Sequence, residues 1–128
     1  MTFTDPIGDF LTRMRNAQHG RHTQCRAPWS RIKQEIAEIL QREGFIQSAT
    51  VEGEGVKKEI VVAFKSDRPV LELRRVSKPG SRQYVQTSDV RGLLHGSAMA
   101  LLSTSSGILT HTEAKQKNVG GEMICTVS

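Results

Sequence analysis

Residues 98–110 read AMALLSTSSGILT, and this stretch decides the fold of the second half of the chain. The apolar run 98–102 has the length of a strand, Gly107 interrupts the pattern, and Ile108-Leu109 resumes it. We therefore expect an antiparallel hairpin with hydroxyl side chains at its tip. Such groups donate and accept hydrogen bonds, and they suit phosphates, sugar hydroxyls and base edges. A serine-rich turn without a ligand explains these residues equally well when they are taken alone.

Two helices and a small sheet are expected before this hairpin. The first helix follows Asp5-Pro6, which supply a cap and a first-turn proline. The second begins after Ser30 and ends at Gly44. Their apolar faces are Ile7, Phe10, Leu11, Met14 and Ala17 in the first helix, and Ile32, Ile36, Ile39 and Leu40 in the second. Two antiparallel strands, 45–51 and 56–64, then flank a glycine turn.

The charged segment 65–69, which contains a proline, is the best place for a boundary between subdomains. We place an N-terminal α+β subdomain at 1–64 and a mostly β C-terminal subdomain at 65–128. The elements expected after the boundary are a strand at 70–73, a basic turn at 74–85 around Pro79-Gly80, a short helix from Ser88-Asp89, a helix from a Thr112 cap to Lys117, and a strand at 122–127.

The charge of the chain points to an anionic partner. The 128 residues carry 18 Lys and Arg against 13 Asp and Glu, a formal net charge of +5. Residues 1–64 hold 9 basic and 8 acidic side chains, and residues 65–128 hold 9 and 5, so the excess lies with the hydroxyl segment. Cys25 and Cys125 have no disulfide spacing, and no apolar stretch or leader pattern is present. We expect a cytoplasmic protein with free thiols.

RNA fits the polar residues better than other anions do. The hydroxyl tip, the basic turn 74–84 and the Arg13/Asn16 face of the first helix offer cations and directional donors, and Tyr84 offers a stacking face. A-form RNA presents 2′-hydroxyls across a shallow minor groove, which short hydroxyl side chains can reach. The basic turn is explained equally simply as a solvated loop.

The sequence also contains candidate residues for two other kinds of chemistry, zinc binding and ester or peptide hydrolysis. His19, His22 and Cys25 are zinc-ligand types spaced three apart, but a structural site needs a fourth ligand, so we expect no metal and no cofactor. Ser103 or Ser105 with His95 or His111 and Asp89 has the composition of a hydrolase triad. No Gly-x-Ser-x-Gly elbow surrounds these serines, so we expect no enzyme.

Motifs along the whole chain resemble the bacterial form of a ribosomal protein family, the eighth protein of the small subunit. The matching segments are DPIGDFLTRMRNA at 5–17, IKQEIAEIL at 32–40, EGFI at 43–46, RVSKPGSR at 75–82, LSTSSGILT at 102–110, Glu113-Ala114 and Gly120-Gly121-Glu122. The last three form the signature of the family. Departures are Ser97, Ala98, His111, Trp29 and the terminal CTVS at 125–128, and none lies in the signature. We expect Trp29 to pack at the start of the second helix rather than anchor a neighbour.

The resemblance implies a fold and a partner. The fold would be α+β, with two small subdomains packed in layers, helices outside and sheets between. The protein would be a primary binder of the central domain of small-subunit rRNA that helps to assemble the platform beside proteins five and twelve, in the cytoplasm or in an organellar ribosome. No membrane and no small-molecule substrate are implied. An RNA-binding regulator acting off the ribosome uses the same surface and stays open.

The resemblance also carries residue roles onto this sequence. Three groups of residues would contact RNA: Ser103, Thr104, Ser105, Gly107, Thr110 and Glu122 from the signature; Lys78, Pro79, Gly80, Arg82 and Tyr84 from the basic turn; and Asp5, Pro6, Arg13 and Asn16 from the first subdomain.

Overall fold

The computed structural model describes residues 5–67, 69–86, 89 and 98–128. Contacts within the chain divide it into two compact units. The N-terminal unit is Pro6–Leu71, and the C-terminal unit is Glu72–Ser128 together with Asp5. The division thus falls after Leu71, whereas the sequence suggested 64/65. Leu71 is buried, and its amide donates to Gln18 Oε1 at 3.2 Å, which ties the connecting segment to the N-terminal unit.

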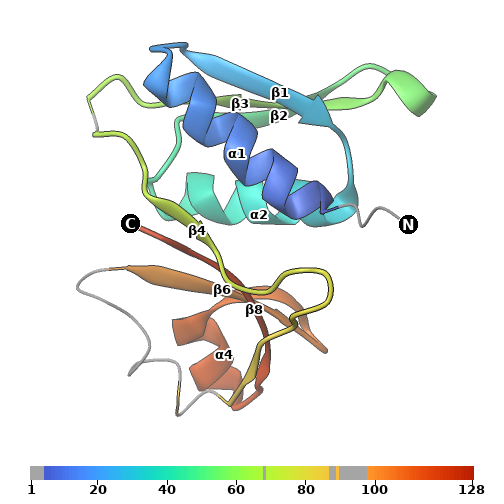
Figure 1. The fold of residues 1–128 in the computed structure, drawn as a ribbon, viewed down its shortest axis with the longest axis vertical. Helices are drawn as coiled ribbons and strands as arrows, with labels where there is room; N and C mark the ends of the chain where they lie inside the picture. Colours follow the sequence, from blue (N-terminus) through green and yellow to red (C-terminus); the bar gives the residue numbers. More distant parts are fainter. Residues whose placement is uncertain (1–4, 68, 87–88, 90–97) are drawn as a thin grey trace. The chain divides into compact units, whose positions relative to one another are not determined.

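The N-terminal unit is a three-stranded antiparallel sheet with two helices packed on it (Figure 1). The sheet has the order β1-β3-β2, so β3 is central. Its elements, in chain order, are α1 (Pro6–His19), β1 (Gln24–Pro28), α2 (Arg31–Arg42), β2 (Ser48–Glu52), the 3-10 helix η1 (Gly55–Lys57) and β3 (Glu59–Ala63). Both helices and the strand pair expected after Gly44 are confirmed.

The core of this unit follows the helical spacing seen in the sequence. Phe10, Leu11 and Met14 are buried on α1, and Ile36 and Leu40 are buried on α2. They meet the apolar side of the sheet, where Ala27 pairs with Ile60 and Cys25 with Val62. The Ser30 hydroxyl caps α2 by accepting from the Lys33 amide at 3.3 Å.

Trp29 packs at the start of α2, as expected. Its indole Nε1 donates to Gln34 Oε1 at 2.7 Å, and Lys58 Nζ lies 3.9 Å from the centre of the ring. The neighbouring Lys33 is buried, and its ammonium donates to the Pro28 carbonyl at 2.8 Å. Burial lowers the pKa of Lys33, while Asp9 raises it and Arg13 lowers it by smaller amounts.

The C-terminal unit is an antiparallel sheet built around β8. The strands run in the order β4-β8-β6-β7, and β5 also pairs with β8. Its elements are β4 (Leu73–Arg75), β5 (Tyr84–Val85), β6 (Met99–Thr104), β7 (Gly107–Thr110), α4 (His111–Lys117) and β8 (Gly121–Val127). One face of the sheet packs against α4 through Ala100, Leu102, Leu109, Ala114 and Met123. The expected α+β class and the hairpin of residues 98–110 are confirmed.

Several element boundaries differ from the sequence-based expectation. The strands expected at 45–51 and 56–64 are shorter, at Ser48–Glu52 and Glu59–Ala63, because the Lys57 and Lys58 amides donate back to the Glu54 and Gly55 carbonyls and form η1. The strand expected at 70–73 begins at Leu73, because Leu73 is the first residue in register with β8 and Leu71 bonds to Gln18 instead. The cap of α4 is Thr110 and not Thr112. The helix expected from Ser88-Asp89 falls, apart from Asp89, on residues that the structure does not describe.

The two cysteines are free, as the sequence suggested, and the structure shows that both are buried. Burial raises the pKa of Cys25 to about 11, although nearby Arg13 lowers it somewhat. Burial likewise raises the pKa of Cys125 to about 12 against a smaller opposing effect of Arg75. Both thiols therefore stay protonated and unreactive near neutral pH.

Candidate nucleic-acid interface

The hydroxyl tip is a two-residue turn between β6 and β7. Thr104 pairs with Gly107, which leaves Ser105 and Ser106 exposed in the turn. The Thr104 hydroxyl accepts from the Ser106 amide at 3.0 Å and donates to the Gly107 carbonyl at 2.8 Å. Within the described part of the chain, the Ser103 and Ser105 hydroxyls make no hydrogen bond. Thr104 thus shapes the turn, and the two serines are available to a ligand.

Glycines fix this turn and the neighbouring strand in different ways. Gly107 has a φ of +97°, and the space where a side chain would stand is open. This backbone conformation suits the glycine that follows a tight hairpin turn. A Cβ at Gly121 would collide with the Ser103 carbonyl oxygen, and one at Gly120 with the Val85 carbonyl oxygen. The Gly120-Gly121 pair therefore lets β8 approach its neighbours closely.

Three polar side chains form a row across the sheet beside the turn. Ser103 of β6 lies opposite Glu122 of β8, and Glu122 lies opposite Tyr84 of β5. Directly opposed residues project from the same face, and here that is the face away from Leu102 and α4. Tyr84 is 73 % exposed. The row thus offers a hydroxyl, a carboxylate and an open aromatic ring to one ligand.

The basic turn is a closed loop anchored on β8. Lys78 and Ser81 exchange both backbone hydrogen bonds, at 3.1 and 2.9 Å, around Pro79-Gly80. Gly80 has a φ of +83°, as the third position of a type II turn requires. At the base of the loop, the buried Ser77 hydroxyl accepts from the Gln83 amide at 2.8 Å and donates to the Gln83 carbonyl at 3.3 Å.

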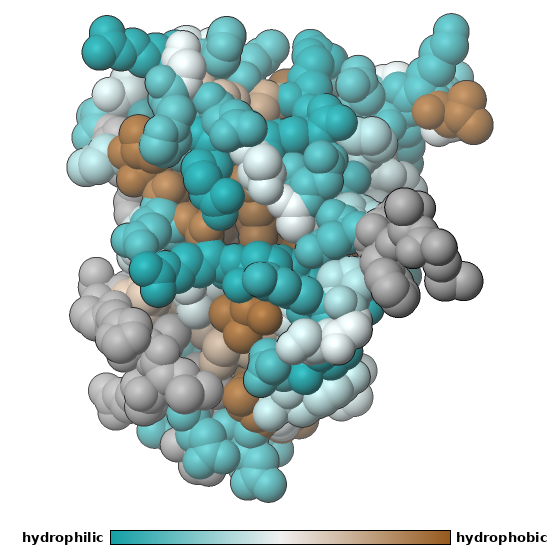
Figure 2. All heavy atoms as spheres, in the orientation of Figure 1, coloured by the Kyte–Doolittle hydropathy of each residue, from teal (hydrophilic) through white to brown (hydrophobic). Residues whose placement is uncertain are grey.

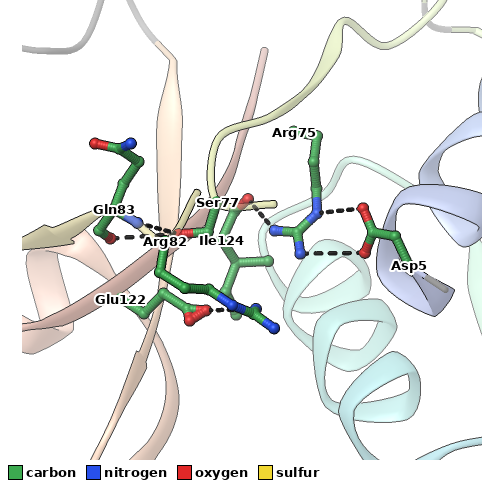
Figure 3. A network of polar contacts seen from close by, with 7 residues as sticks. All are labelled: Asp5, Arg75, Ser77, Arg82, Gln83, Glu122 and Ile124. Carbon is green, nitrogen blue, oxygen red and sulfur yellow. Dashed lines mark hydrogen bonds and ion pairs between the residues drawn. The ribbon is translucent and has the colours of Figure 1, made fainter. Parts of the chain in front are cut away.

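Two arginines of this region are paired with acids in different ways (Figure 3). The Arg75 guanidinium bonds both Asp5 oxygens at 3.2 Å and the Ile124 carbonyl at 2.7 Å, and its side chain is only 10 % exposed. Arg82 reaches Glu122 through one contact, Nη1 to Oε1 at 3.1 Å, with the arginine side chain 47 % exposed. Asp5 is therefore held inside the C-terminal unit, whereas Arg82 lies at the surface.

The three residues expected from the first helix are in the other unit. Pro6, Arg13 and Asn16 are exposed on α1, opposite its apolar residues, and hydrophilic side chains cover much of the surface over α1 (Figure 2). Arg13 Nε bonds Asp9 at 2.8 Å and Nη1 donates to the Arg26 carbonyl at 3.2 Å. Two of its three guanidinium nitrogens are thus already engaged.

The structure corrects the expectation for Thr110. Its side chain is 1 % exposed, and the hydroxyl accepts from the Glu113 amide at 3.2 Å, while Glu113 Oε1 accepts from the Thr110 amide at 3.1 Å. This reciprocal capping box starts α4. Thr110 is a structural residue of the signature and not part of the open surface.

The hydrolase and zinc alternatives gain no support from the geometry. His111 Nδ1 accepts from the Ala100 amide at 3.1 Å, at the end of β7 away from the serine turn. His95 lies outside the described residues. Among the residues that are described, no three His, Cys, Asp or Glu side chains gather as a metal site, and none of the helices is long and apolar enough to span a membrane.

Sequence reasoning counted Arg75 only as one cation of the basic turn and gave no separate role to Ser77, although both shape the surface. Ser77 closes the loop, and Arg75 binds Asp5. Ser77 lies between an apolar residue and a tight turn, and a hydroxyl residue at such a position often bonds the backbone of the turn. This pattern could have predicted its role.

Comparison with known proteins explains this constellation. The family model described as ribosomal protein S8 matches residues 5–128. The chain belongs to the ribosomal protein S8 family. Relatives called small ribosomal subunit protein uS8 are 48 % identical in Anaeromyxobacter dehalogenans, 50 % in Streptococcus equi subsp. zooepidemicus and 47 % in Kineococcus radiotolerans, each over 99 % of both chains.

Membership of the S8 family confirms several expectations. The resemblance drawn from the motifs is correct, and the protein is a ribosomal, rRNA-binding protein and not an enzyme. The bacterial origin of the relatives agrees with a ribosomal place in the cytoplasm. The family accounts for the signature 102–122 as a unit, of which Ser103, Ser105 and Glu122 face outward and Thr110 faces inward.

Proposed function

We propose that this protein binds small-subunit rRNA through one continuous surface of its C-terminal unit. We call it the hairpin surface: Ser103, Thr104, Ser105, Gly107, Glu122, Lys78, Pro79, Gly80, Arg82 and Tyr84. The observation that carries the proposal is the row Ser103–Glu122–Tyr84, which the strand register places on one face. The Ser103 and Ser105 hydroxyls, which bond no other described residue, then lie on the same surface as the exposed Tyr84 ring and the loop cations.

Distorted duplex RNA is the ligand that this surface fits. Short hydroxyls reach 2′-hydroxyls and base edges in a shallow minor groove, and Tyr84 can stack on an unpaired base. Lys78 and Arg82 add attraction to phosphates that is independent of sequence. DNA recognition usually inserts a helix into the major groove. The hairpin surface instead presents strand ends and turns.

The more specific target rests on the resemblance. We place the binding site in the central domain of the rRNA, where the bound protein would help to organise the platform beside ribosomal proteins five and twelve. In the N-terminal unit, Pro6, Asn16 and the outer face of Arg13 would add contacts to RNA. Asp5 would act indirectly, because Arg75 holds its carboxylate.

A binding titration over a range of salt concentrations tests this proposal. Ser105→Ala should weaken binding to a central-domain rRNA fragment by about 1 to 3 kcal/mol at unchanged salt slope, because it removes a hydrogen bond and no charge. Arg82→Ala should make the slope shallower by about one unit. Ser106→Ala, a neighbour in the same turn outside the proposed set, is the matched control. Equal affinity of Ser105→Ala and wild type excludes the proposed contact.

Cosedimentation separates a ribosomal role from a regulatory one. A protein that acts in the ribosome should sediment with small subunits from cell extract, and Ser105→Ala should reduce the bound fraction. A regulator acting off the ribosome would bind an isolated RNA through the same surface and stay in the supernatant.

A further inference from the structure

We propose that Glu122 is a positioning residue that pairs with Arg82 in the RNA-free protein, so that the pair withholds this cation from RNA that does not fit the surface. The inference rests on the proposed function and adds a source of specificity to it. Glu122 is an acid in the middle of a surface for a polyanion, between Ser103 and Tyr84. An unpaired carboxylate there would repel phosphates.

The geometry favours a pair that can open. Arg82 and Glu122 meet through one contact of 3.1 Å, and the side chains are 47 % and 18 % exposed. In the same unit, the Arg75 guanidinium makes three hydrogen bonds and is 10 % exposed. The half-exposed arginine and the single contact make this pair weaker than the Arg75–Asp5 pair, so a phosphate can displace Glu122 from Arg82 at the exposed side of the guanidinium. Arg75 has no comparable freedom.

The loop holds Arg82 where its guanidinium can exchange Glu122 for an RNA phosphate. Ser77 and Gln83 close the loop immediately before Tyr84, and the Met123 amide donates to the Gln83 carbonyl at 2.8 Å. The backbone next to Arg82 is therefore fixed by hydrogen bonds, whereas its half-exposed guanidinium group has room to move. When Ser103 and Tyr84 engage a fitting RNA, Arg82 can turn to a phosphate and Glu122 can accept a hydrogen bond from a base amino or sugar hydroxyl group.

RNA that offers only phosphates should meet a different surface. Such RNA forms no hydrogen bond with Ser103 and no stacking contact with Tyr84. The charge of Arg82 stays neutralised by Glu122. The pair then lowers affinity for unrelated RNA more than affinity for the fitting RNA. Because the pair has a single contact and a half-exposed arginine, we expect a discrimination of about two- to fivefold between the two kinds of RNA.

The test measures salt-dependent binding of a central-domain rRNA fragment and of an unrelated RNA duplex of equal length. Glu122→Gln keeps the side-chain volume and should raise affinity for the unrelated duplex about two- to fivefold and steepen its salt slope by about one unit. Arg82→Gln should lower affinity for the unrelated duplex by a similar factor, because it leaves the Glu122 carboxylate unpaired among the phosphates. The double variant, Glu122→Gln with Arg82→Gln, should return the affinity for the unrelated duplex to the wild-type value.

Glu72→Gln is the matched control, because Glu72 forms an exposed pair with Arg74 in the same unit at 3.3 Å but lies outside the row. It should change binding of the unrelated duplex less than Glu122→Gln does. The proposal is overturned if Glu122→Gln leaves that duplex unchanged or weakens it, or if Glu72→Gln has the same effect. Thermal unfolding confirms that each variant is folded. If wild type does not prefer the rRNA fragment, the proposed function is contradicted. The role of the Arg82–Glu122 pair is tested independently, by the effect of Glu122→Gln on affinity for the unrelated duplex.

Discussion

Arg75 binds both carboxylate oxygens of Asp5 across a separation of 70 residues, Nε to Oδ2 and Nη2 to Oδ1, each at 3.2 Å. Asp5 thereby belongs to the C-terminal unit, although the chain continues from it directly into α1 of the N-terminal unit. The pair is largely shielded, with side chains 10 % and 28 % exposed.

Asp5→Asn should therefore destabilise the protein by about 1 to 3 kcal/mol, since it leaves the Arg75 guanidinium without its counter-charge. The free energy of unfolding in urea at pH 7 is the measurement. Glu72→Gln, which opens an exposed pair, should cost at most about 0.5 kcal/mol. A loss for Asp5→Asn no larger than that of the control would show that the Arg75 pair is without structural importance.

Gly121→Ala should disrupt the sheet where β8 begins beside β6. The new Cβ meets the Ser103 carbonyl oxygen, which belongs to backbone that is paired in β6 and cannot move alone. We expect a loss of about 2 to 4 kcal/mol, as for overpacking that shifts backbone. Gly80→Ala is the comparison, because it strains a positive φ without meeting any atom, and it should cost about 1 to 2 kcal/mol. Thermal unfolding measures both losses. A larger loss for Gly80→Ala than for Gly121→Ala would contradict the close approach of the β8 and β6 backbones at Gly121.

Ser77→Ala should loosen the basic turn. The hydroxyl is buried and bonds both backbone groups of Gln83, so its removal takes away two hydrogen bonds and should cost about 1 to 2 kcal/mol. Amide hydrogen exchange at Gln83 should accelerate in the variant. Ser81→Ala removes only an exposed contact of 3.5 Å and serves as control. Unchanged protection of the Gln83 amide would contradict the proposed role of the Ser77 hydroxyl in closing the turn.

The buried thiols predict a loss of stability at alkaline pH. The folded pKa of Cys125 is about 12 against an ordinary value of 9.0, so the folded state keeps a proton that the unfolded chain releases. This contribution is complete below pH 9 and is lost as the pH rises toward 12. One pH unit above the unfolded value, each thiol should account for about 1 kcal/mol of the loss.

Urea unfolding at pH 8 and pH 10 measures this linkage. Cys125→Ala starts from a lower stability because of the cavity, but it should lose about 1 kcal/mol less than wild type between the two pH values. Folded wild type should also resist a thiol reagent at pH 8. Rapid labelling of Cys125 in folded protein would contradict its burial.

The elements that could be predicted from the sequence are those decided by local patterns. The hairpin 98–110, α2 between Ser30 and Gly44, and the Pro79-Gly80 turn each carry their own periodicity or turn residues. The cap of α4 could not be assigned in this way, because Thr110 and Thr112 are both suitable residues. The pairing of Thr110 with Leu101 decides where β7 ends and the helix begins.

The candidate site shows the same division between local and long-range information. The signature identified the serines, the glycines and Glu122, but not which hydroxyl is available. That depends on Thr104 bonding within its own turn and Thr110 capping a helix. The row Ser103–Glu122–Tyr84 and the pair Arg82–Glu122 join segments about 20 to 40 residues apart, and only the strand register brings them together.

The position of β8 in the chain has a consequence for the time at which this protein becomes competent during synthesis. β8 pairs with β4, β5 and β6, and all three precede it along the chain. None of these pairings can form until β8 has left the ribosome that makes it, whereas the N-terminal unit needs nothing beyond Leu71. A nascent chain can thus fold its first unit early and still have no row of Ser103, Glu122 and Tyr84. Under the proposed function, incomplete chains therefore lack the surface needed to occupy the RNA site of finished ones.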